Sequence, residues 1–169
     1  FVLSPGMHGF LMFLGSFTII AAVMMALVQH DLRRLLGYHA VSQVGYMVLG
    51  IGTGVPLGIA GGMFHMLNNT LYKTGLFMAG GAVIHDSGTG DLDKLGGYAR
   101  KTPIVFWVFL VCALAIAGVP PLNGFVSKWM IYQSLVQTGK TGGGLWPVWL
   151  AAAMFGSALT LASFMKVLH

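Results

Sequence analysis

Residues 57–84 read LGIAGGMFHMLNNTLYKTGLFMAGGAVI, an apolar run of bilayer length with a histidine, two asparagines and a lysine in its middle. About 20 apolar residues in a helix span a bilayer core, and ionisable residues inside such a span are costly. His65, Asn69 and Lys73 are spaced four residues apart, so a helix places them on one slowly drifting stripe. Lys73 lies too deep in the run for its side chain to reach the headgroups. The run therefore predicts a membrane helix that holds a charge inside the bilayer.

The composition places the rest of the chain in the same environment. Apolar residues make up 56% and charged residues 8% of the 169 residues, whereas soluble domains are roughly 25% charged. The net charge is +5, but no basic run or basic helix face is present, so we expect no nucleic-acid partner. Cys112 is the only cysteine, which excludes disulfides and zinc or iron–sulfur clusters built from this chain alone. We expect no metal and no other cofactor.

Four further segments are apolar and long enough to belong to the membrane. We expect spans at about 9–29, 35–53, 57–84, 103–137 and 145–167, with one extended polar loop at 85–102. The predicted fold is all-α: a polytopic bundle of five transmembrane segments that forms a single domain over residues 1–169. We also expect the chain to be a piece of a longer subunit.

The segment 103–137 is too long for one straight span. Its 35 residues would extend about 52 Å as a helix. The sequence GVPPLNG at 118–124 interrupts it, and Pro120 and Pro121 lack the amide hydrogens that a continuous helix needs. We predict a single discontinuous span, with the break marked by Gly118, Pro120, Pro121 and Gly124. Broken helices occur in membranes where the freed backbone groups line a cavity or a pathway.

The cationic residues of the loops predict the orientation. With five crossings, one side holds six and the other holds only Lys140; the six are Arg33, Arg34, Lys94, Arg100, Lys101 and Lys166. By the positive-inside rule the first side, with loops 30–34 and 85–102, is cytoplasmic. All four acids fall on that same side. Lys73 and Lys128 are then the only formal charges inside the membrane, and no carboxylate of the spans can pair with them.

Buried groups of this kind suit proton transfer. A buried lysine without a counterion can exchange between its charged and neutral forms, and histidine titrates near neutral pH. The alternative is a lysine held permanently charged by main-chain carbonyls or by a carboxylate of a neighbouring subunit. For Asn68 and Asn69, hydrogen bonding between helices is at least as good an explanation as a place in the path. We expect His39, near a helix end, to be an interfacial residue.

Three motifs resemble a known family: DLRRLLGYHAVSQVGYMVLGIG (31–52), FHMLNNTLYKTGLF (64–77) and AGVPPLNGFVSK (117–128). They are similar to the antiporter-like, proton-translocating membrane subunits of respiratory complex I (NADH-quinone oxidoreductase). The same family includes membrane subunits of energy-converting hydrogenases and formate hydrogenlyase, and the large subunits of multisubunit cation/proton antiporters. The resemblance covers essentially the whole chain, in the order that the family has.

The resemblance implies the second of two inverted five-helix repeats. By match of motif, Lys73 takes the place of the central lysine, His65 that of the histidine two turns before it, and Lys128 that of the lysine on the broken helix, toward the outward exit. The family often has a second histidine at the position of Asn69. The asparagine of this chain removes one titratable step. The first repeat, with its membrane glutamate and paired lysine, is absent from these residues.

These observations lead to three hypotheses. The first is proton translocation through Lys73, with His65 and Asn69 nearby, to Lys128, in a redox-driven complex of a prokaryotic inner membrane. Its partners would be other membrane subunits, the lipid bilayer and protons, and any oxidoreductase catalysis would belong to partner chains. The second is a subunit of a secondary Na⁺/H⁺ antiporter, and the third is a non-conducting structural membrane subunit. The sequence leaves open which complex it is, its electron donor and acceptor, H⁺ versus Na⁺, and whether the chain is a fragment or naturally split.

Overall fold

The computed structural model describes residues 4–140, 142 and 144–168; the remaining residues of the expected domain 1–169 lie outside the described part. Its helices are α1 (Pro5–Leu27), α2 (Leu32–Gly52), α3 (Pro56–Ser87), the 3₁₀ turn η1 (Leu92–Lys94), α4 (Tyr98–Lys101), α5 (Pro103–Ala117), α6 (Asn123–Lys140) and α7 (Trp146–Leu168). The described residues include no strand, only an isolated bridge between Asp31 and Asp91. The predicted all-α fold class is confirmed.

Local sequence signals explain where the long helices begin and end. Pro56 and Pro103 occupy first-turn positions of α3 and α5, where a missing amide hydrogen costs nothing. The Asp31 side chain caps α2 by accepting a hydrogen bond from the Arg34 amide at 3.0 Å. Gly88 and Gly118 end α3 and α5 in the left-handed conformation, with φ of 71° and 83°, which glycine adopts without a steric penalty.

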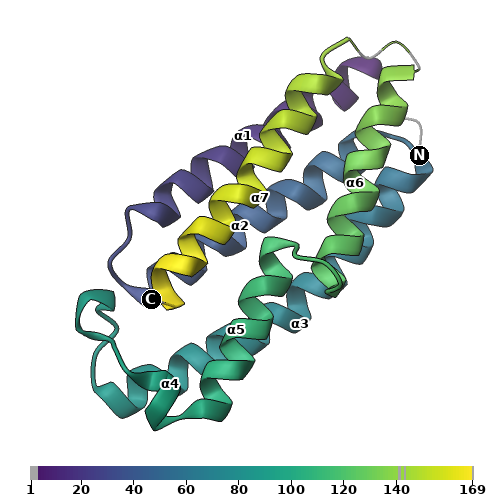
Figure 1. Cartoon of the computed structure of the whole chain (residues 1–169). Coiled ribbons are helices and arrows are strands. Elements are labelled where there is room, and N and C mark those ends of the chain that lie inside the picture. Colours follow the sequence, from purple (N-terminus) through teal and green to yellow (C-terminus); the bar gives the residue numbers. More distant parts are fainter. Residues whose placement is uncertain (1–3, 141, 143, 169) are drawn as a thin grey trace.

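The helices form an elongated bundle (Figure 1). Helix α2 packs against α1 and α3, α3 also packs against α5 and α6, and α7 lies against α1, α5 and α6. The chain does not reverse direction between α5 and α6: α5 ends and α6 starts near the middle of the bundle's length (Figure 1). The break in the fourth segment is therefore inside the bundle and not at one of its ends.

The core has two apolar clusters. One lies among α2, α3, α5 and α7 and includes Leu36, Leu76 and Ile116; the other lies among α1, α2, α6 and α7 and includes Leu49 and Ile131. On α2 the buried polar residues His39, Ser42 and Gln43 stand between the members of the two clusters. The bundle thus has a polar layer across its interior.

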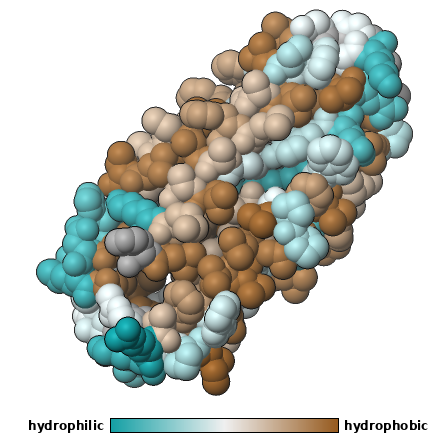
Figure 2. Space-filling model, viewed as in Figure 1, coloured by the Kyte–Doolittle hydropathy of each residue, from teal (hydrophilic) through white to brown (hydrophobic). Residues whose placement is uncertain are grey.

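The face seen in Figure 2 is mostly apolar along the middle of the bundle and most hydrophilic at the two ends. Among the described residues, two helical segments are long and apolar enough to cross a membrane by length and composition alone, Gly6–Leu27 and Trp146–Leu168, and α5 is a shorter apolar helix. Helix α3 has 32 residues, about 48 Å of helix, which exceeds a bilayer core of about 30 Å. It carries the polar residues on which the proposed site depends.

Two details differ from the expected boundaries. Residues 85–87 continue α3, and the rest of the expected loop 85–102 contains η1 and α4; the helix runs on because its terminating glycine is Gly88 and not a residue before His85. Asn123 and Gly124, expected in the break, form the first turn of α6. There the Asn123 side-chain oxygen accepts the Gly124 amide at 3.0 Å.

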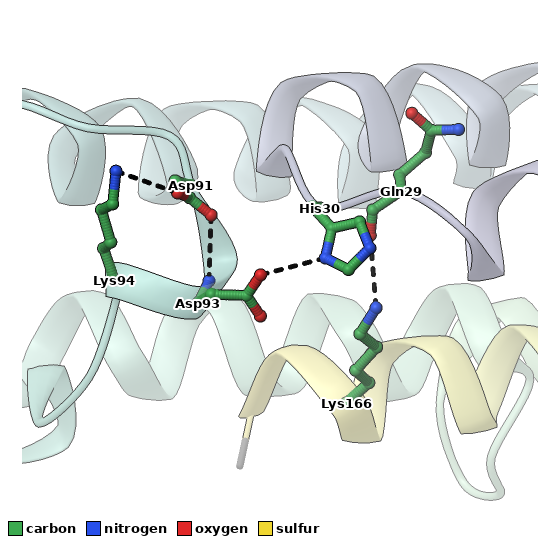
Figure 3. Close-up of polar contacts among 6 residues, drawn as sticks. All are labelled: Gln29, His30, Asp91, Asp93, Lys94 and Lys166. Carbon is green, nitrogen blue, oxygen red and sulfur yellow. Dashed lines mark hydrogen bonds and ion pairs between the residues drawn. The ribbon is translucent and has the colours of Figure 1, made fainter.

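Polar contacts close the end of the bundle where this loop lies (Figure 3). The turn between α1 and α2 pairs with the loop through main-chain bonds from Leu32 to Gly90 and from Leu92 to His30. His30 Nδ1 lies 3.0 Å from an Asp93 carboxylate oxygen, and Lys166 of α7 donates to the Gln29 carbonyl at 3.3 Å. Loops far apart in sequence are therefore fixed to one another at this end.

Candidate functional site

The interior of the bundle contains a group of buried polar side chains. Their members come from α2, α3, α6 and α7: His39, Ser42, Gln43, His65, Asn68, Lys73, Ser127, Lys128, Ser134, Thr160 and Ser163. Buried polar groups are costly unless they are hydrogen-bonded. The partners of each group therefore show what the site can do.

Lys73 lies on α3 and is 7% exposed. Its Nζ donates to the main-chain carbonyl of Leu36 on α2 at 2.6 Å, and it stands 5.7 Å from the centre of the Phe77 ring. The ion pairs found among the described residues lie in the loop at 85–102 and the turn before α2, so neither involves Lys73. The Lys73 ammonium group is therefore in contact with a main-chain carbonyl and an aromatic ring.

Lys128 is 1% exposed and is held by the break in the helix. Its Nζ donates to the carbonyls of Ile116 at 2.8 Å and Ala117 at 3.4 Å, and to Ser157 Oγ at 3.1 Å. The two carbonyls belong to the last turn of α5, where they have no helical amide partner because the helix stops. The negative end of the α5 dipole also favours a cation there. The break thus supplies two hydrogen-bond acceptors for the lysine that follows it.

The close approach of the two half-helices requires a glycine. A Cβ at Gly124 would overlap the carbonyl oxygen of Ala115 on α5. Gly118, in the left-handed region, has the Lys128 side chain beside it. Of the expected break residues, Gly118 and Gly124 therefore flank the short connection that places Lys128, and Pro120 and Pro121 lie within it.

His65 bridges three helices. Its Nε2 lies 3.1 Å from Gln43 Oε1 on α2 and 3.5 Å from Tyr72 Oη, and its Nδ1 lies 2.8 Å from Ser127 Oγ on α6. Ser127 Oγ also donates to the Gly124 carbonyl at 3.1 Å. An imidazolium could donate to Ser127 while Ser127 donates to Gly124, and a neutral ring could accept from Ser127 instead. The surroundings of His65 accommodate both protonation states.

The two asparagines have different surroundings. Asn68 is buried and makes a reciprocal pair with Asn123 at the start of α6, with distances of 3.1 and 3.0 Å. Asn69 is half-buried, and its shielded Oδ1 has no hydrogen-bond partner among the described residues. Of the two, Asn68 is the one that ties α3 to the broken helix.

His39 differs from the expectation of an interfacial residue. It is fully buried, 2.8 Å from Ser163 Oγ and stacked on Phe164 at 4.7 Å, both on α7. The reason is that α7 packs over this part of α2. Its Nδ1 has no hydrogen-bond partner in the described part of the chain.

Sequence reasoning missed several contributors to the site. Gln43 and Ser127 hold His65, while Ser157, Tyr46 and Tyr132 surround Lys128; the Tyr46 ring centre lies 4.5 Å from its Nζ. The spacing of His39, Gln43 and Tyr46 along α2 was a usable signal, because it puts polar groups on one face. Ser157 had no such signal, since a lone serine in an apolar helix is common.

Chemically, the site contains two buried ammonium groups and one imidazole, joined to hydroxyl, amide and carbonyl groups. Hydrogen bonds connect His65 to Ser127, and Lys128 to Ser157. Among the described residues no hydrogen bond joins Lys73 to either of these two groups. Groups of these kinds can bind and exchange protons, and a proton transfer from Lys73 to either group would require side-chain motion or intervening water.

Comparisons with known proteins give one consistent result. The family model described as "NADH:quinone oxidoreductase/Mrp antiporter, TM" matches residues 1–165. The chain is 39% identical over 143 residues to formate hydrogenlyase subunit 3 of Escherichia coli, covering 78% of this chain and 24% of that protein. It is 36% identical over 164 residues to a Na(+)/H(+) antiporter subunit of Alkalihalophilus pseudofirmus, covering 96% of this chain and 32% of that protein.

A solved structure agrees with these relatives. The Mrp complex from Dietzia sp. DQ12-45-1b contains a chain that matches with a TM-score of 0.88 and 32% identity, covering 95% of this chain and 29% of that one. The chain therefore spans about a quarter to a third of the length of each of these three proteins.

Proposed function

Because this chain belongs to the NADH:quinone oxidoreductase/Mrp antiporter transmembrane family, we propose that it is a proton-translocating subunit of a redox-driven membrane complex. The observation that carries the proposal is a pair of lysines buried inside a helix bundle with carbonyl, hydroxyl and aromatic neighbours. One of them stands beside a break in a helix. The complex would be of the NADH-quinone oxidoreductase or the hydrogenase and formate hydrogenlyase type, and other membrane subunits would be its partners.

In the proposed route, protons pass through Lys73, with His65 and Asn69 nearby, to Lys128. The two lysines differ in how their charges are held. Lys128 has three acceptors, which match the three donors of an ammonium group, whereas Lys73 has one hydrogen bond, to Leu36. We therefore expect Lys73 to release its proton more readily than Lys128 does. Two cations in a medium of low dielectric repel each other, so a proton on one changes the protonation of the other.

The proposed topology has five membrane segments in a prokaryotic inner membrane. The turn at 30–34 and the loop at 85–102 lie at one end of the bundle and Lys140 at the other (Figure 1). Six cationic residues at the first end against one at the second favour a cytoplasmic position for the first. Lys128 then lies between the middle of the bundle and the outer face.

The experiment compares Lys73→Ala and Lys128→Ala with the wild-type chain in the assembled complex in sealed membrane vesicles. We expect each variant to lose most of the protons moved per substrate turned over. Normal proton stoichiometry in both variants would contradict the proposal. Lys128→Arg adds a discrimination: arginine keeps the charge but does not release a proton. Normal proton stoichiometry in Lys128→Arg would instead support the alternative in which Lys128 stays permanently charged.

A second candidate function is that of a Na⁺/H⁺ antiporter subunit. It is favoured by the similarity to an antiporter subunit over 96% of this chain and to a chain of the Mrp complex. All four acids of the sequence lie near the loop end of the bundle, away from the buried lysines, so the interior lacks the carboxylate oxygens that suit Na⁺. Uptake of ²²Na⁺ by vesicles without a redox substrate separates the two candidate functions. The redox proposal predicts no ²²Na⁺ uptake that depends on this subunit, whereas the antiporter function predicts such uptake.

A further inference from the structure

The Ser157 hydroxyl lies at the meeting point of three polar groups. Its Oγ is 3.1 Å from Lys128 Nζ, 2.9 Å from Tyr46 Oη and 2.7 Å from Tyr132 Oη. These groups come from α7, α6 and α2, so the hydroxyl connects three helices around the buried lysine. Ser157 was not among the residues that the sequence singled out.

Counting protons shows what this hydroxyl can do. Tyr46 donates its own proton to the Ala153 carbonyl at 2.6 Å, so it can only accept from Ser157. Ser157 has one proton for its three neighbours. When Lys128 is an ammonium group it donates to Ser157, and the serine proton turns to a tyrosine. When Lys128 is neutral, its lone pair can accept the serine proton instead. The orientation of one hydroxyl is thus linked to the charge of Lys128.

The side chains of Tyr46 and Tyr132 have different surroundings. Tyr46 is fully buried, and its hydroxyl ends at a main-chain carbonyl. Tyr132 is half-buried and lines a groove of about 510 Å³ formed by α6, α7 and the start of α3. Its polar lining residues are Gln133, Gln137 and Lys140 on α6, and five apolar residues line the rest. Tyr132 is therefore the branch that opens to the surface.

The groove runs toward the end of the bundle opposite the acidic loop. Gln133, Gln137 and Lys140 recur at helical spacing and are exposed, so they form a polar stripe on a helix of an otherwise apolar surface. Hydrophilic side chains are visible in Figure 2 where α6 lies in Figure 1. Amides and a charge at such positions favour water over lipid. From Tyr132 to Lys140 the helix rises about 12 Å.

We propose that Ser157 and Tyr132 form the relay through which Lys128 exchanges protons with this groove; the inference rests on the proposed function. In the outward step the Lys128 ammonium group gives a proton to Ser157 Oγ, Ser157 gives its own proton to Tyr132 Oη, and Tyr132 releases its proton to water in the groove. Lys128 ends neutral, both hydroxyls end neutral, and one proton has moved. Rotation of the two hydroxyls restores the starting arrangement.

The test uses Ser157→Ala and Tyr132→Phe in the assembled complex in sealed vesicles, with proton movement measured during turnover. Each variant removes one hydroxyl, and we expect proton movement to fall by at least about tenfold. Ser157→Thr keeps the hydroxyl and should restore movement, which a purely structural role of the serine would not predict. Ser16→Ala and Tyr38→Phe are the matched controls. Ser16 lies on α1, and its buried Oγ has no hydrogen-bond partner among the described residues; Tyr38 is not part of the Ser157 network.

The outcomes separate the two proposals. If Ser157→Ala and Tyr132→Phe behave like the controls while Lys128→Ala loses proton movement, the relay is wrong and the proposed function stands. If Ser157→Thr is as impaired as Ser157→Ala, the hydroxyl does not account for the loss of proton movement, and the relay is also wrong. If Lys73→Ala and Lys128→Ala both keep full proton movement, the proposed function fails and the relay fails with it.

Discussion

Main-chain carbonyls hold the charges of both buried lysines. Lys73 donates to Leu36, and Lys128 donates to Ile116 and Ala117. A carbonyl offers a partial charge where a carboxylate offers a full one, so it stabilises an ammonium group less strongly and leaves proton release within reach. At the scale of single residues, the position of each carbonyl relative to its lysine therefore determines how strongly the ammonium group is stabilised.

Substitution of Gly124 by alanine tests this dependence. The added Cβ would overlap the carbonyl oxygen of Ala115, so α5 and α6 must separate. We expect Gly124→Ala to cost about 1–3 kcal/mol of stability, as overpacking does, and to lower proton movement because Ile116 and Ala117 move away from Lys128. Thermal unfolding of the solubilised complex and vesicle assays measure the two effects.

Gly81→Ala is the control for that substitution. Gly81 lies within α3, and a Cβ there meets nothing within 4 Å. Alanine also favours a helix over glycine by about 1 kcal/mol, so stability should be unchanged or higher. Equal behaviour of Gly124→Ala and Gly81→Ala would show that the half-helices are not in close contact.

At the scale of helices, the sequence predicts where helices begin and break better than it predicts which helices pack together. Pro56, Pro103 and Pro120 mark the starts and the break, because the lack of an amide hydrogen acts locally. Helix α3 ends at Ser87, three residues beyond the expected end. That end depends on which glycine adopts the left-handed conformation, and neighbouring residues do not determine that.

The same contrast applies to the candidate site. His65, Lys73 and Lys128 could be selected from the sequence because an ionisable group in an apolar run is costly wherever it points. Ser127 and Ser157 could not, because their importance comes from residues 62 and 29 positions away that the fold brings within hydrogen-bond distance. Tertiary packing, rather than local composition, determines those contacts.

We expect the stability of the loop that follows α3 to depend on pH. The Asp91 carboxylate accepts the Asp93 amide at 3.2 Å and lies 3.3 Å from Lys94 Nζ. These contacts, the amide first, hold the pKa of Asp91 below its ordinary value. A lowered folded-state pKa means that the stabilisation is complete above the ordinary pKa of aspartate and is lost as the pH falls through the lowered value. Hydrogen exchange of residues 90–94, corrected for the intrinsic pH dependence, should show this loss only in acid.

Asp91→Asn should weaken the protection of these amides at neutral pH and remove the acid transition. Asp86→Asn removes the same charge near the end of α3, at a position outside the ion pairs of the described residues, so it should change neither. An acid transition that persists in Asp91→Asn would assign it to another group.

At the scale of the whole molecule, the two ends of the bundle differ in charge. The end with the loop carries all four acids and six of the cationic residues, and the other end carries Lys140. This asymmetry predicts that, in a Cys112→Ser background, a cysteine at Lys94 reacts with an impermeant maleimide only from the cytoplasmic face. A cysteine at Lys140 should react only from the outer face. Labelling of intact cells and of inverted vesicles measures both.

The opposite labelling pattern would reverse the orientation and make the groove beside Tyr132 an entrance from the cytoplasm. Labelling of both positions from one face would contradict an odd number of membrane segments. Either result would leave the fold unchanged, since the positions of the loops within the bundle do not depend on the membrane.

The central claim is that buried lysines carry the protons, and Lys73→Met tests it most directly. Methionine is apolar and unbranched, so it can fill the space along α3 without the charge or the proton. The matched control is Thr74→Val, the next residue, which is exposed and bonds only within its own helix, to the Thr70 carbonyl. The measurement is the number of protons moved per substrate turned over in sealed vesicles with equal amounts of assembled complex. We predict that Lys73→Met loses proton movement while Thr74→Val retains it; a wild-type ratio in Lys73→Met would contradict the account.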